Sequence, residues 1–274
     1  MRKGFYHAKG GLTLCLLLFG HITSERAMDQ TEKSILEVEG LYKSFGGLMA
    51  VNNLNLKVYG GEILGVIGPN GSGKTTAFNL ITGLLKPDDG KVKFKGNDIT
   101  GIKPHQICKA GIARTFQLVK PFARMTVLQN VMAGRAYGRR PVQGMRQAKS
   151  QAEELLEFTG LGSKRSVVAS QLGLADRKRL EITRALATKP ELLLLDEAMA
   201  GLNPAETQDA MRLMKEIRAS GITLMLVEHV MQVVLGMSDR IVVINAGEKI
   251  AEGKPQHIVS NKEVIAAYLG RRYA

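Results

Sequence analysis

The octapeptide GPNGSGKT at positions 68–75 decides the fold of this sequence, because it matches the pattern G-x-x-x-x-G-K-[ST] at every fixed position. Its residues are Gly68, Pro69, Asn70, Gly71, Ser72, Gly73, Lys74 and Thr75. Glycines let successive N–H groups turn toward phosphate oxygens, and a helix that follows adds the positive end of its dipole. We therefore predict a nucleotide phosphate loop. Lys74 would reach the β- and γ-phosphates, the Thr75 hydroxyl would hold Mg²⁺, and Thr76 would donate to the α-phosphate.

The segments around the octapeptide have the pattern that such a loop requires. Residues 63–67 form an apolar run typical of a buried strand, and residues 75–85 have the composition of a helix. Upstream, residues 34–41 and 51–58 alternate between apolar and polar side chains, as half-buried strands do, and residues 91–94 suggest another strand. The first third is thus predicted to be an antiparallel β layer followed by a strand–loop–helix unit.

Strands and helices continue to alternate along the rest of the chain. Predicted helices cover residues 127–134, 145–161, 176–188, 205–219 and 264–269, and predicted strands cover 192–195, 222–227 and 240–244, with a hairpin turn at 246–248. Pro204 suits the first turn of its helix. The pattern predicts an α/β P-loop NTPase: a RecA-like core with an antiparallel β layer, plus an inserted α-helical subdomain at about 119–186.

Acidic and polar residues follow three of these segments. Asp196 ends an apolar strand, where its carboxylate can coordinate Mg²⁺, and Glu197 can orient or deprotonate the attacking water. Without the phosphate loop, this pair is also compatible with a strand followed by an acidic turn. His229 can sense the γ-phosphate, although a lone histidine is more often structural. Gln117 can reach Mg²⁺ or the water from the loop that enters the helical insert.

Composition and charge leave several partners open. The formal net charge of +13 permits nucleic acid, an anionic membrane surface or an anionic substrate, or a solvated basic face. The two cysteines, Cys15 and Cys108, have no paired spacing that would indicate a metal site or a disulfide framework. This usage fits a reducing compartment.

The first 33 residues are predicted to be an N-terminal extension. Residues 11–20 are apolar and follow a mildly basic segment, as in a signal peptide, but no small-residue cleavage pattern follows. The run is much shorter than the ~20 residues of a spanning helix. We expect synthesis to begin naturally at Met28, and we expect residues 271–274 to form a short tail.

The order of these elements resembles the ATP-binding subunits of ABC transporters, over residues 34–270 as one ATP-binding domain. The resemblance implies that Phe45 stacks on adenine and that Gln117 is the glutamine of the Q-loop. It also implies that Asp196 is the Walker B aspartate, Glu197 the catalytic glutamate and His229 the switch histidine. Such subunits bind ATP and Mg²⁺ and work as head-to-tail dimers, in which the signature motif of one subunit meets the ATP of the other.

Several segments are similar to the ATP-binding subunits of branched-chain amino-acid importers. They are FGGL (45–48), GIARTFQ (111–117), MTVLQNVM (125–132), AGLNP (200–204), VEHVM (227–231) and AYLG (267–270). Urea, amide and lipopolysaccharide systems share much of this pattern. The resemblance implies separate membrane permease subunits, which would dock on a surface from Gln117 to about Ala136. It also implies a periplasmic or extracellular solute-binding protein and a peripheral position on the cytoplasmic face of the inner membrane.

The signature motif, usually near LSGGQ, departs from the family pattern. It aligns with Leu172, Gly173, Leu174, Ala175 and Asp176. No hydroxyl is left to meet a phosphate, although backbone N–H groups and a helix N-terminus remain. We expect Asp176 to serve as the N-cap of the following helix, and its charge to disfavour a nearby phosphate.

Two further positions also depart from the family. The proline that usually follows the catalytic glutamate is Ala198, and the aspartate of the D-loop is Asn203. These changes favour a heterodimer with a different ATP-binding subunit. In such a pair, the site built from this chain's Walker A and the partner's signature would be the better hydrolytic site.

Two other functions are compatible with parts of the sequence. A soluble ABC protein acting on nucleic acid is allowed by the charge, but the sequence has one ATP-binding domain, no zinc motif and no long coiled coil. We therefore expect no nucleic-acid partner. A small-molecule P-loop kinase would leave Gln117, His229 and the motif order unexplained.

Overall fold

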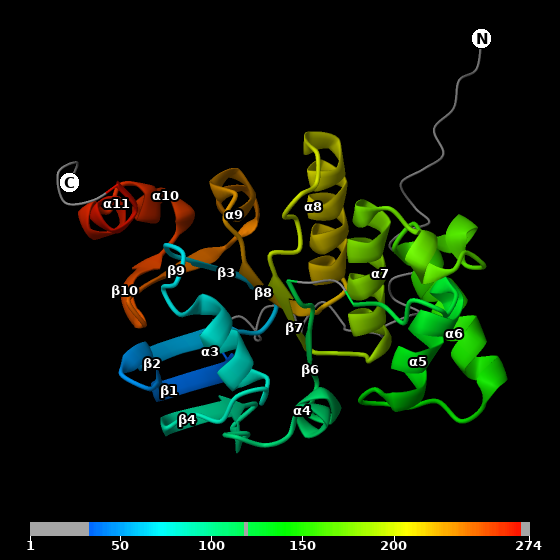
Figure 1. Ribbon diagram of the computed structural model, residues 1–274, viewed down its shortest axis with the longest axis horizontal. Coiled ribbons are helices and arrows are strands. Elements are labelled where there is room, and N and C mark those ends of the chain that lie inside the picture. Colours follow the sequence, from blue (N-terminus) through cyan, green and yellow to red (C-terminus); the bar gives the residue numbers. More distant parts are fainter. Residues whose placement is uncertain (1–32, 118–119, 270–274) are drawn as a thin grey trace, which may run out of the picture.

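The computed structural model describes residues 33–117 and 120–269. The predicted start at Met28, the tail at 271–274 and nearly all of the N-terminal extension lie outside these residues. Within them the chain forms two β-sheets with packed helices, and a group of helices stands apart on one side (Figure 1). This is the α/β architecture with a helical insert that the sequence predicts.

The smaller sheet is the antiparallel layer, with the strand order β2-β1-β4-β5. Its strands are β1 (Ser34–Phe45), β2 (Leu48–Tyr59), β4 (Asp89–Phe94) and β5 (Asn97–Asp98). Leu36, Val38 and Leu41 of β1 are buried, and most of the residues between them are partly exposed, as expected for a half-buried strand. β1 and β2 run beyond the predicted ranges because their pairing continues to Phe45 and Leu48 at the hairpin.

The larger sheet has the order β10-β9-β3-β8-β7-β6. Its strands are β3 (Ile63–Ile67), β6 (Ile112–Arg114), β7 (Leu192–Asp196), β8 (Thr223–Val227), β9 (Arg240–Asn245) and β10 (Glu248–Gly253). All pairs are parallel except β10 with β9. Every residue of β3, β7 and β8 is buried, because helices or the smaller sheet cover both faces. The sequence did not predict β6, since three residues are too few to show a period.

Helices fill the space between the sheets and cover the far side of the larger one. They are α3 (Lys74–Ile81), α4 (Pro104–Ala110), α5 (Val127–Tyr137), α6 (Met145–Phe158), α7 (Leu174–Ala187), α8 (Pro204–Ala219), α9 (Met231–Met237), α10 (Pro255–Val259) and α11 (Lys262–Leu269). α3 packs Phe78 and Ile81 among buried side chains of both sheets. α5, α6 and α7 pack on one another and form the helical group in Figure 1. None of the helices described is both long and apolar enough to cross a bilayer.

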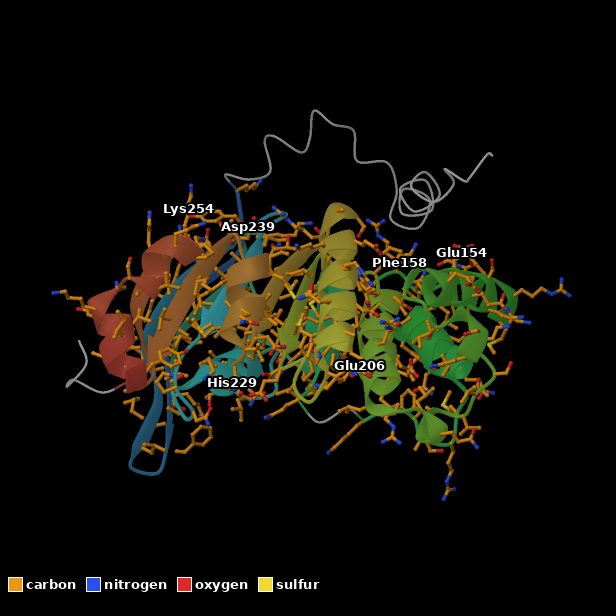
Figure 2. The ribbon with its side chains drawn as sticks, turned by 90° about the horizontal axis from the view of Figure 1, so that it is seen from above. Glu154, Phe158, Glu206, His229, Asp239 and Lys254 are labelled. Atoms are coloured by element: carbon orange, nitrogen blue, oxygen red, sulfur yellow. The ribbon has the colours of Figure 1, made fainter. Side chains whose placement is uncertain are left out.

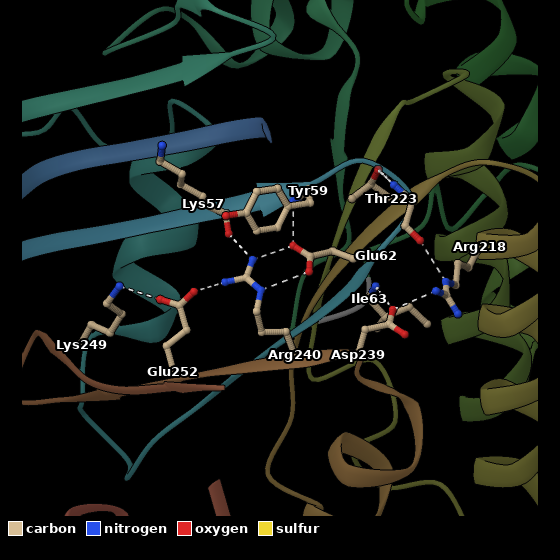
Figure 3. Close-up of polar contacts among 11 residues, drawn as sticks. Lys57, Tyr59, Glu62, Ile63, Arg218, Thr223, Asp239, Arg240, Lys249 and Glu252 are labelled. Atoms are coloured by element: carbon tan, nitrogen blue, oxygen red, sulfur yellow. Dashed lines mark hydrogen bonds and ion pairs between the residues drawn. The ribbon is translucent and has the colours of Figure 1, made fainter. Parts of the chain in front are cut away.

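A polar network closes the edge of the larger sheet where β3, β8 and β9 begin (Figure 3). Arg240 donates to both carboxylate oxygens of Glu62, from Nη2 at 2.7 Å and from Nε at 3.2 Å, and it also donates to the Lys57 carbonyl. Its guanidinium pairs with Glu252 and lies 4.9 Å from the centroid of the Tyr59 ring. Ligands bind parallel sheets at the opposite edge, so this network serves stability.

Candidate active site

The carboxyl ends of the parallel strands bring the predicted site residues to one edge of the larger sheet. In the register, Val66 of β3 and Asp196 of β7 both lie opposite Val227 of β8, and Arg114 of β6 lies opposite Leu194. The loops that leave these strands therefore start side by side. They carry the phosphate loop, Gln117, Glu197 and His229. This edge is where ligands bind in open α/β sheets.

The phosphate loop is held between the two sheets by close backbone contacts. A Cβ on Gly68 would lie 1.9 Å from the Ile244 carbonyl oxygen, and one on Gly73 would lie 2.3 Å from the Ala50 carbonyl oxygen. Both glycines have a positive φ, 156° and 103°. Within the loop Ser72 is buried, whereas Asn70, Gly71 and Thr75 are exposed at its tip.

Lys74 lies inside the curl of the loop. Its Nζ donates to the carbonyl oxygens of Gly68, at 2.9 Å, and Pro69, at 2.8 Å, and it lies 3.3 Å from the Ser72 hydroxyl. Burial lowers the pKa of Lys74, and the nearby carboxylates of Asp196 and Glu197 oppose that shift. The ammonium is thus placed at the centre of the loop, where phosphate oxygens would displace its carbonyl partners.

Glu197 joins two of the other predicted residues. Its Oε2 accepts a hydrogen bond from Gln117 Nε2 at 2.8 Å, and its Oε1 lies 2.6 Å from His229 Nε2. A carboxylate can only accept, so Nε2 of the imidazole carries the proton in this contact. The Glu197 side chain is 14% exposed, whereas that of His229 is 41% exposed. The three residues come from loops after β6, β7 and β8, and the structure brings them together as the sequence predicts.

The backbone at Glu197 is in the left-handed region, with φ at 49°. This conformation costs free energy for a residue with a Cβ and persists only where neighbours hold it. Glu197 N–H donates to the Val227 carbonyl at 2.9 Å, and the Glu197 carbonyl accepts from Lys178 Nζ at 2.8 Å. The Glu197 N–H is therefore bound from outside its own loop, and the Glu197 carbonyl is bound both from outside and by Ala200 N–H, at 3.2 Å, within the loop.

Asp196 is almost completely buried and is paired with Arg114. Arg114 Nη2 donates to Asp196 Oδ2 at 2.7 Å, and the two side chains are 6% and 1% exposed. The guanidinium also donates to Asn79 Oδ1 at 2.6 Å, and it lies 5.6 Å and 5.2 Å from the ring centroids of Phe78 and Phe116. Burial raises the pKa of Asp196, and the hydrogen bond and charge of Arg114 oppose the rise.

The second oxygen of Asp196 fits a metal ion. Oδ1 is buried and has no hydrogen-bond partner among the described residues. Asp196 and Thr75 both line one cleft of about 800 Å³, which also reaches Gln117. Mg²⁺ is usually held by one or two carboxylates together with substrate phosphates. The donor set of Asp196, the Thr75 hydroxyl and Gln117 therefore fits Mg²⁺ bound beside a nucleotide.

Phe45 lies at the tip of the β1–β2 hairpin and is 48% exposed. The Lys43 ammonium lies 5.6 Å from its ring centroid. Figure 2 shows that the hairpin projects toward the same side of the molecule as His229, whereas Asp239 and Lys254 lie toward the opposite side. The ring is thus exposed on the side of the molecule that carries His229, and stacking on adenine stays a prediction for it.

The signature segment surrounds the start of α7. Leu172 is buried, Leu174 is 48% exposed, and a Cβ on Gly173 would have nothing within 4 Å. The prediction that Asp176 caps this helix is wrong. Gly173 is the N-cap residue and Asp176 lies inside the first turn, where it pairs with Lys164. The helix begins earlier than its apolar pattern indicated, and the ion pair gives the Asp176 side chain another partner.

One of the two other departures, Asn203, has a structural role. Asn203 is the N-cap of α8: its Oδ1 accepts from Glu206 N–H at 2.9 Å, and Glu206 Oε2 accepts from Asn203 N–H at 2.9 Å. The predicted position of Pro204 in the first turn is confirmed. Ala198, which follows Glu197 in the chain, is buried, with 8% exposure.

Four functional candidates were missed at the level of sequence. Arg114, Lys178, Glu181 and Glu228 are buried charged residues that contact the site or the loops that carry it. The sequence feature that could have indicated two of them is a charged residue on the apolar face of a helix: Lys178 and Glu181 lie on the buried face of α7. Which groups such charges meet is decided only by the packing of distant segments.

Comparison with known proteins identifies the family. A model of the ABC transporter family matches residues 51–200. The chain belongs to the ABC transporter family. A second model, the branched-chain amino acid ATP-binding cassette transporter, matches residues 248–274. The high-affinity branched-chain amino acid transport ATP-binding protein LivG of Escherichia coli K12 is 43% identical over 249 residues, or 86% of this chain and 98% of LivG.

Solved structures of this family have the same fold. One is the crystal structure of the ADP conformation of an ABC transporter cassette. Its match to this chain covers 87% of this chain and 100% of the cassette, with a TM-score of 0.79 and 34% identity. A dimeric cassette in a post-hydrolysis state, bound to ADP and Pi, covers 80% and 98%, with a TM-score of 0.73 and 27% identity. The predicted P-loop NTPase fold is confirmed. ABC transporter ATP-binding proteins are ATPases that power transport, and this chain is one of them.

Proposed function

We propose that this chain energises the import of branched-chain amino acids through separate membrane permease subunits. The geometric observation that supports it is the Glu197 carboxylate, held between Gln117 and His229 at the sheet edge that carries the phosphate loop. The similarity to LivG over 86% of the chain supports the solute class. Urea, amide or lipopolysaccharide systems are the alternative, because their ATP-binding subunits share the motifs of this site.

Hydrolysis would use the residues in separate roles. The phosphate loop from Gly68 to Thr75 and the neighbouring Thr76 would bind the phosphates of ATP, and Lys74 would exchange its carbonyl partners for β- and γ-phosphate oxygens. Glu197 would take a proton from the attacking water as the bond between the γ-phosphorus and the β–γ bridging oxygen breaks. His229 and Gln117 would keep the carboxylate aimed at that water.

Mg²⁺ would be held by Asp196, Thr75 and Gln117, and it would neutralise charge on the β- and γ-phosphates. Arg114 would leave Asp196 Oδ1 free for this purpose by binding Oδ2 alone. Phe45 would stack on the adenine from the hairpin tip.

The dimer would place the signature segment of each subunit on the partner's ATP. In this chain that segment offers the exposed backbone of Gly173 and Leu174 at the start of α7, without a hydroxyl. Asp176 is paired with Lys164, which reduces the repulsion of a phosphate. We propose a heterodimer with a second ATP-binding subunit, in which Glu197 of this chain serves the more active site.

The cleft of about 800 Å³ opens between α3, α4 and β6 on one side and α5 and α7 on the other. The permease would dock in the part lined by α4, α5 and α7, whereas Thr75 and Asp196 line the part proposed for Mg²⁺. The cleft includes Gln117, Phe122 and Gly134, which lie in the segment 117–136 expected to receive the permease. Docking there would place the chain on the cytoplasmic face of the membrane as a peripheral subunit. A solute-binding protein would deliver the amino acid from the other side.

The test is transport by the assembled complex in vesicles, with its permease subunits and solute-binding protein. Leucine, isoleucine or valine should stimulate ATP hydrolysis and accumulate in the vesicles, and Glu197→Gln should reduce both to a small residual level. Stimulation by urea or a short amide instead of these amino acids would reassign the solute. Equal losses from Glu197→Gln here and from the matching change in the partner would contradict the asymmetric heterodimer.

A further inference from the structure

Helix α7 contacts both loops whose side chains meet at Glu197. Lys178 and Glu181 lie three residues apart, so they share one face of the helix. Both are buried, at 7% and 9% exposure. Lys178 contacts the loop after β7, and Glu181 contacts the loop after β6. No step of the proposed hydrolysis uses either residue.

Lys178 and Glu228 fix the loop after β7 at two points. Lys178 Nζ donates to the Glu197 carbonyl at 2.8 Å, and Glu228 Oε1 accepts from Met199 N–H at 2.8 Å. The first of these points is the left-handed residue itself, Glu197, with φ at 49°. The Lys178 ammonium therefore holds the carbonyl of a strained residue whose side chain is the proposed base.

Glu181 fixes the loop after β6 at the residue before Gln117. Its Oε1 accepts from Phe116 N–H at 2.8 Å. Burial raises the pKa of Glu181, and this hydrogen bond, with the charges of Arg184, Lys178 and Arg114, opposes the rise. Gln117, the next residue, donates from Nε2 to Glu197 Oε2 at 2.8 Å. A shift of either loop relative to α7 would break this contact, because a hydrogen bond weakens within a few tenths of an ångström.

We infer that Lys178 and Glu181 are positioning residues for ATP hydrolysis, which hold the loops of Glu197 and Gln117 in register from one face of α7. The inference rests on the proposed role of Glu197 as the catalytic glutamate. The same helix begins at the signature segment, so the helix that would face the partner's ATP also sets the geometry of this chain's own site.

The first experiment replaces Lys178 in the assembled complex. Lys178→Met should lower kcat by about 10- to 100-fold with ATP affinity changed less than about 2-fold, since misplacement by about 1 Å costs on this scale. Lys178→Arg should restore much of kcat, because a guanidinium can donate to the same carbonyl. Lys149→Met, on the exposed face of α6, is the matched control and should keep the original kcat. Equal losses in Lys178→Met and Lys149→Met, or a parallel loss of ATP affinity, would overturn the inference.

A double-mutant cycle tests whether Lys178 acts through Glu197. In a Glu197→Gln background, Lys178→Met should cause little further loss of the residual activity, because residues that act as a unit are not additive. Fully additive losses would contradict positioning. If Glu197→Gln alone keeps full activity, the proposed function of Glu197 fails. If Glu197→Gln leaves only a small residual activity while Lys178→Met has none of its expected effect, only the positioning role of Lys178 fails.

Glu181 gives an independent pair of variants in case Lys178→Met does not fold. Glu181→Gln retains the Oε1 acceptor and should keep kcat within about 3-fold of the parent. Glu181→Leu leaves the Phe116 N–H without a partner and should lower kcat by about 10-fold or more at unchanged ATP affinity. Thermal unfolding of each variant identifies losses due to global instability. Equal kcat in the two folded Glu181 variants would refute the role of this residue.

Discussion

The buried pair of Arg114 and Asp196 predicts a large loss of stability on removal of the guanidinium. Arg114→Met would leave the Asp196 carboxylate, only 1% exposed, without its charged partner. Breaking a buried ion pair from one side costs about 3–5 kcal/mol. Arg114 and Asp196 both line the cleft, so loss of the guanidinium should let water reach the carboxylate, and the cost should lie near the lower limit, about 3 kcal/mol. For a domain of this size, that lowers Tm by about 6–12 °C.

The loss should depend on pH. With Arg114 gone, burial acts on the pKa of Asp196 without the opposing hydrogen bond, so the pKa rises further. A carboxyl with a higher pKa in the folded state binds its proton more tightly there, and acid therefore favours the folded form. The difference in Tm between the variant and the parent should narrow as pH falls from neutral toward the ordinary carboxyl pKa of about 4.

Thermal unfolding followed by circular dichroism over this pH range measures both effects. Arg212→Met is the control, because Arg212 is exposed and its ion pair on α8 should contribute less than about 1 kcal/mol. Adding Asp196→Asn to Arg114→Met removes the unpaired charge and should recover part of the lost Tm. If Arg114→Met is as stable as Arg212→Met, or if the double variant recovers nothing, the cost of the unpaired carboxylate is not the cause.

Three further perturbations test other parts of the structure. Arg240→Met should lower the free energy of unfolding by about 2 kcal/mol relative to Arg212→Met, because it leaves the Glu62 carboxylate without its hydrogen-bond donors. KM for ATP should not change, because the network in Figure 3 is far from the phosphate loop. A change in Tm equal to that of Arg212→Met would contradict this prediction. Gly73→Ala should abolish nucleotide binding in a fluorescence titration, whereas Gly71→Ala, whose added Cβ meets nothing within 4 Å, should weaken it less. Phe45→Ala should weaken ATP binding by about 1–3 kcal/mol, as loss of base stacking does; unchanged affinity would place the adenine elsewhere.

Arg114, whose ion pair with Asp196 should stabilise the fold, also lies next to the loop that carries Gln117. It pairs with Asp196 on one side and lies against Phe116, next to the loop of Gln117, on the other. The same guanidinium lines the cleft proposed for the permease. The proposed Mg²⁺ ligands Asp196, Thr75 and Gln117 line the same cleft, so a change of its occupancy would act next to them.

The sequence by itself determined the parts of the site that depend on local chemistry. The octapeptide at 68–75 predicted its own loop, because a phosphate loop needs glycines, one lysine and one hydroxyl in fixed order. The apolar run before Asp196 and the strand before His229 indicated strand ends, and parallel strands place such ends at one edge. Pro204 predicted the start of α8 to within one residue, since the preference of proline for the first helical turn is local.

Only the tertiary structure decided which groups hold these residues in place. Arg114 and Asp196 are 82 residues apart and Lys178 and Glu197 are 19 apart, and nothing local relates either pair. Asp176 illustrates the same limit: its residue type suggested a cap, but a lysine twelve residues earlier in the chain binds it instead. Three-dimensional packing decides which groups pair with a buried charge. An unpaired charge in the interior costs more free energy than a local preference such as helix capping contributes.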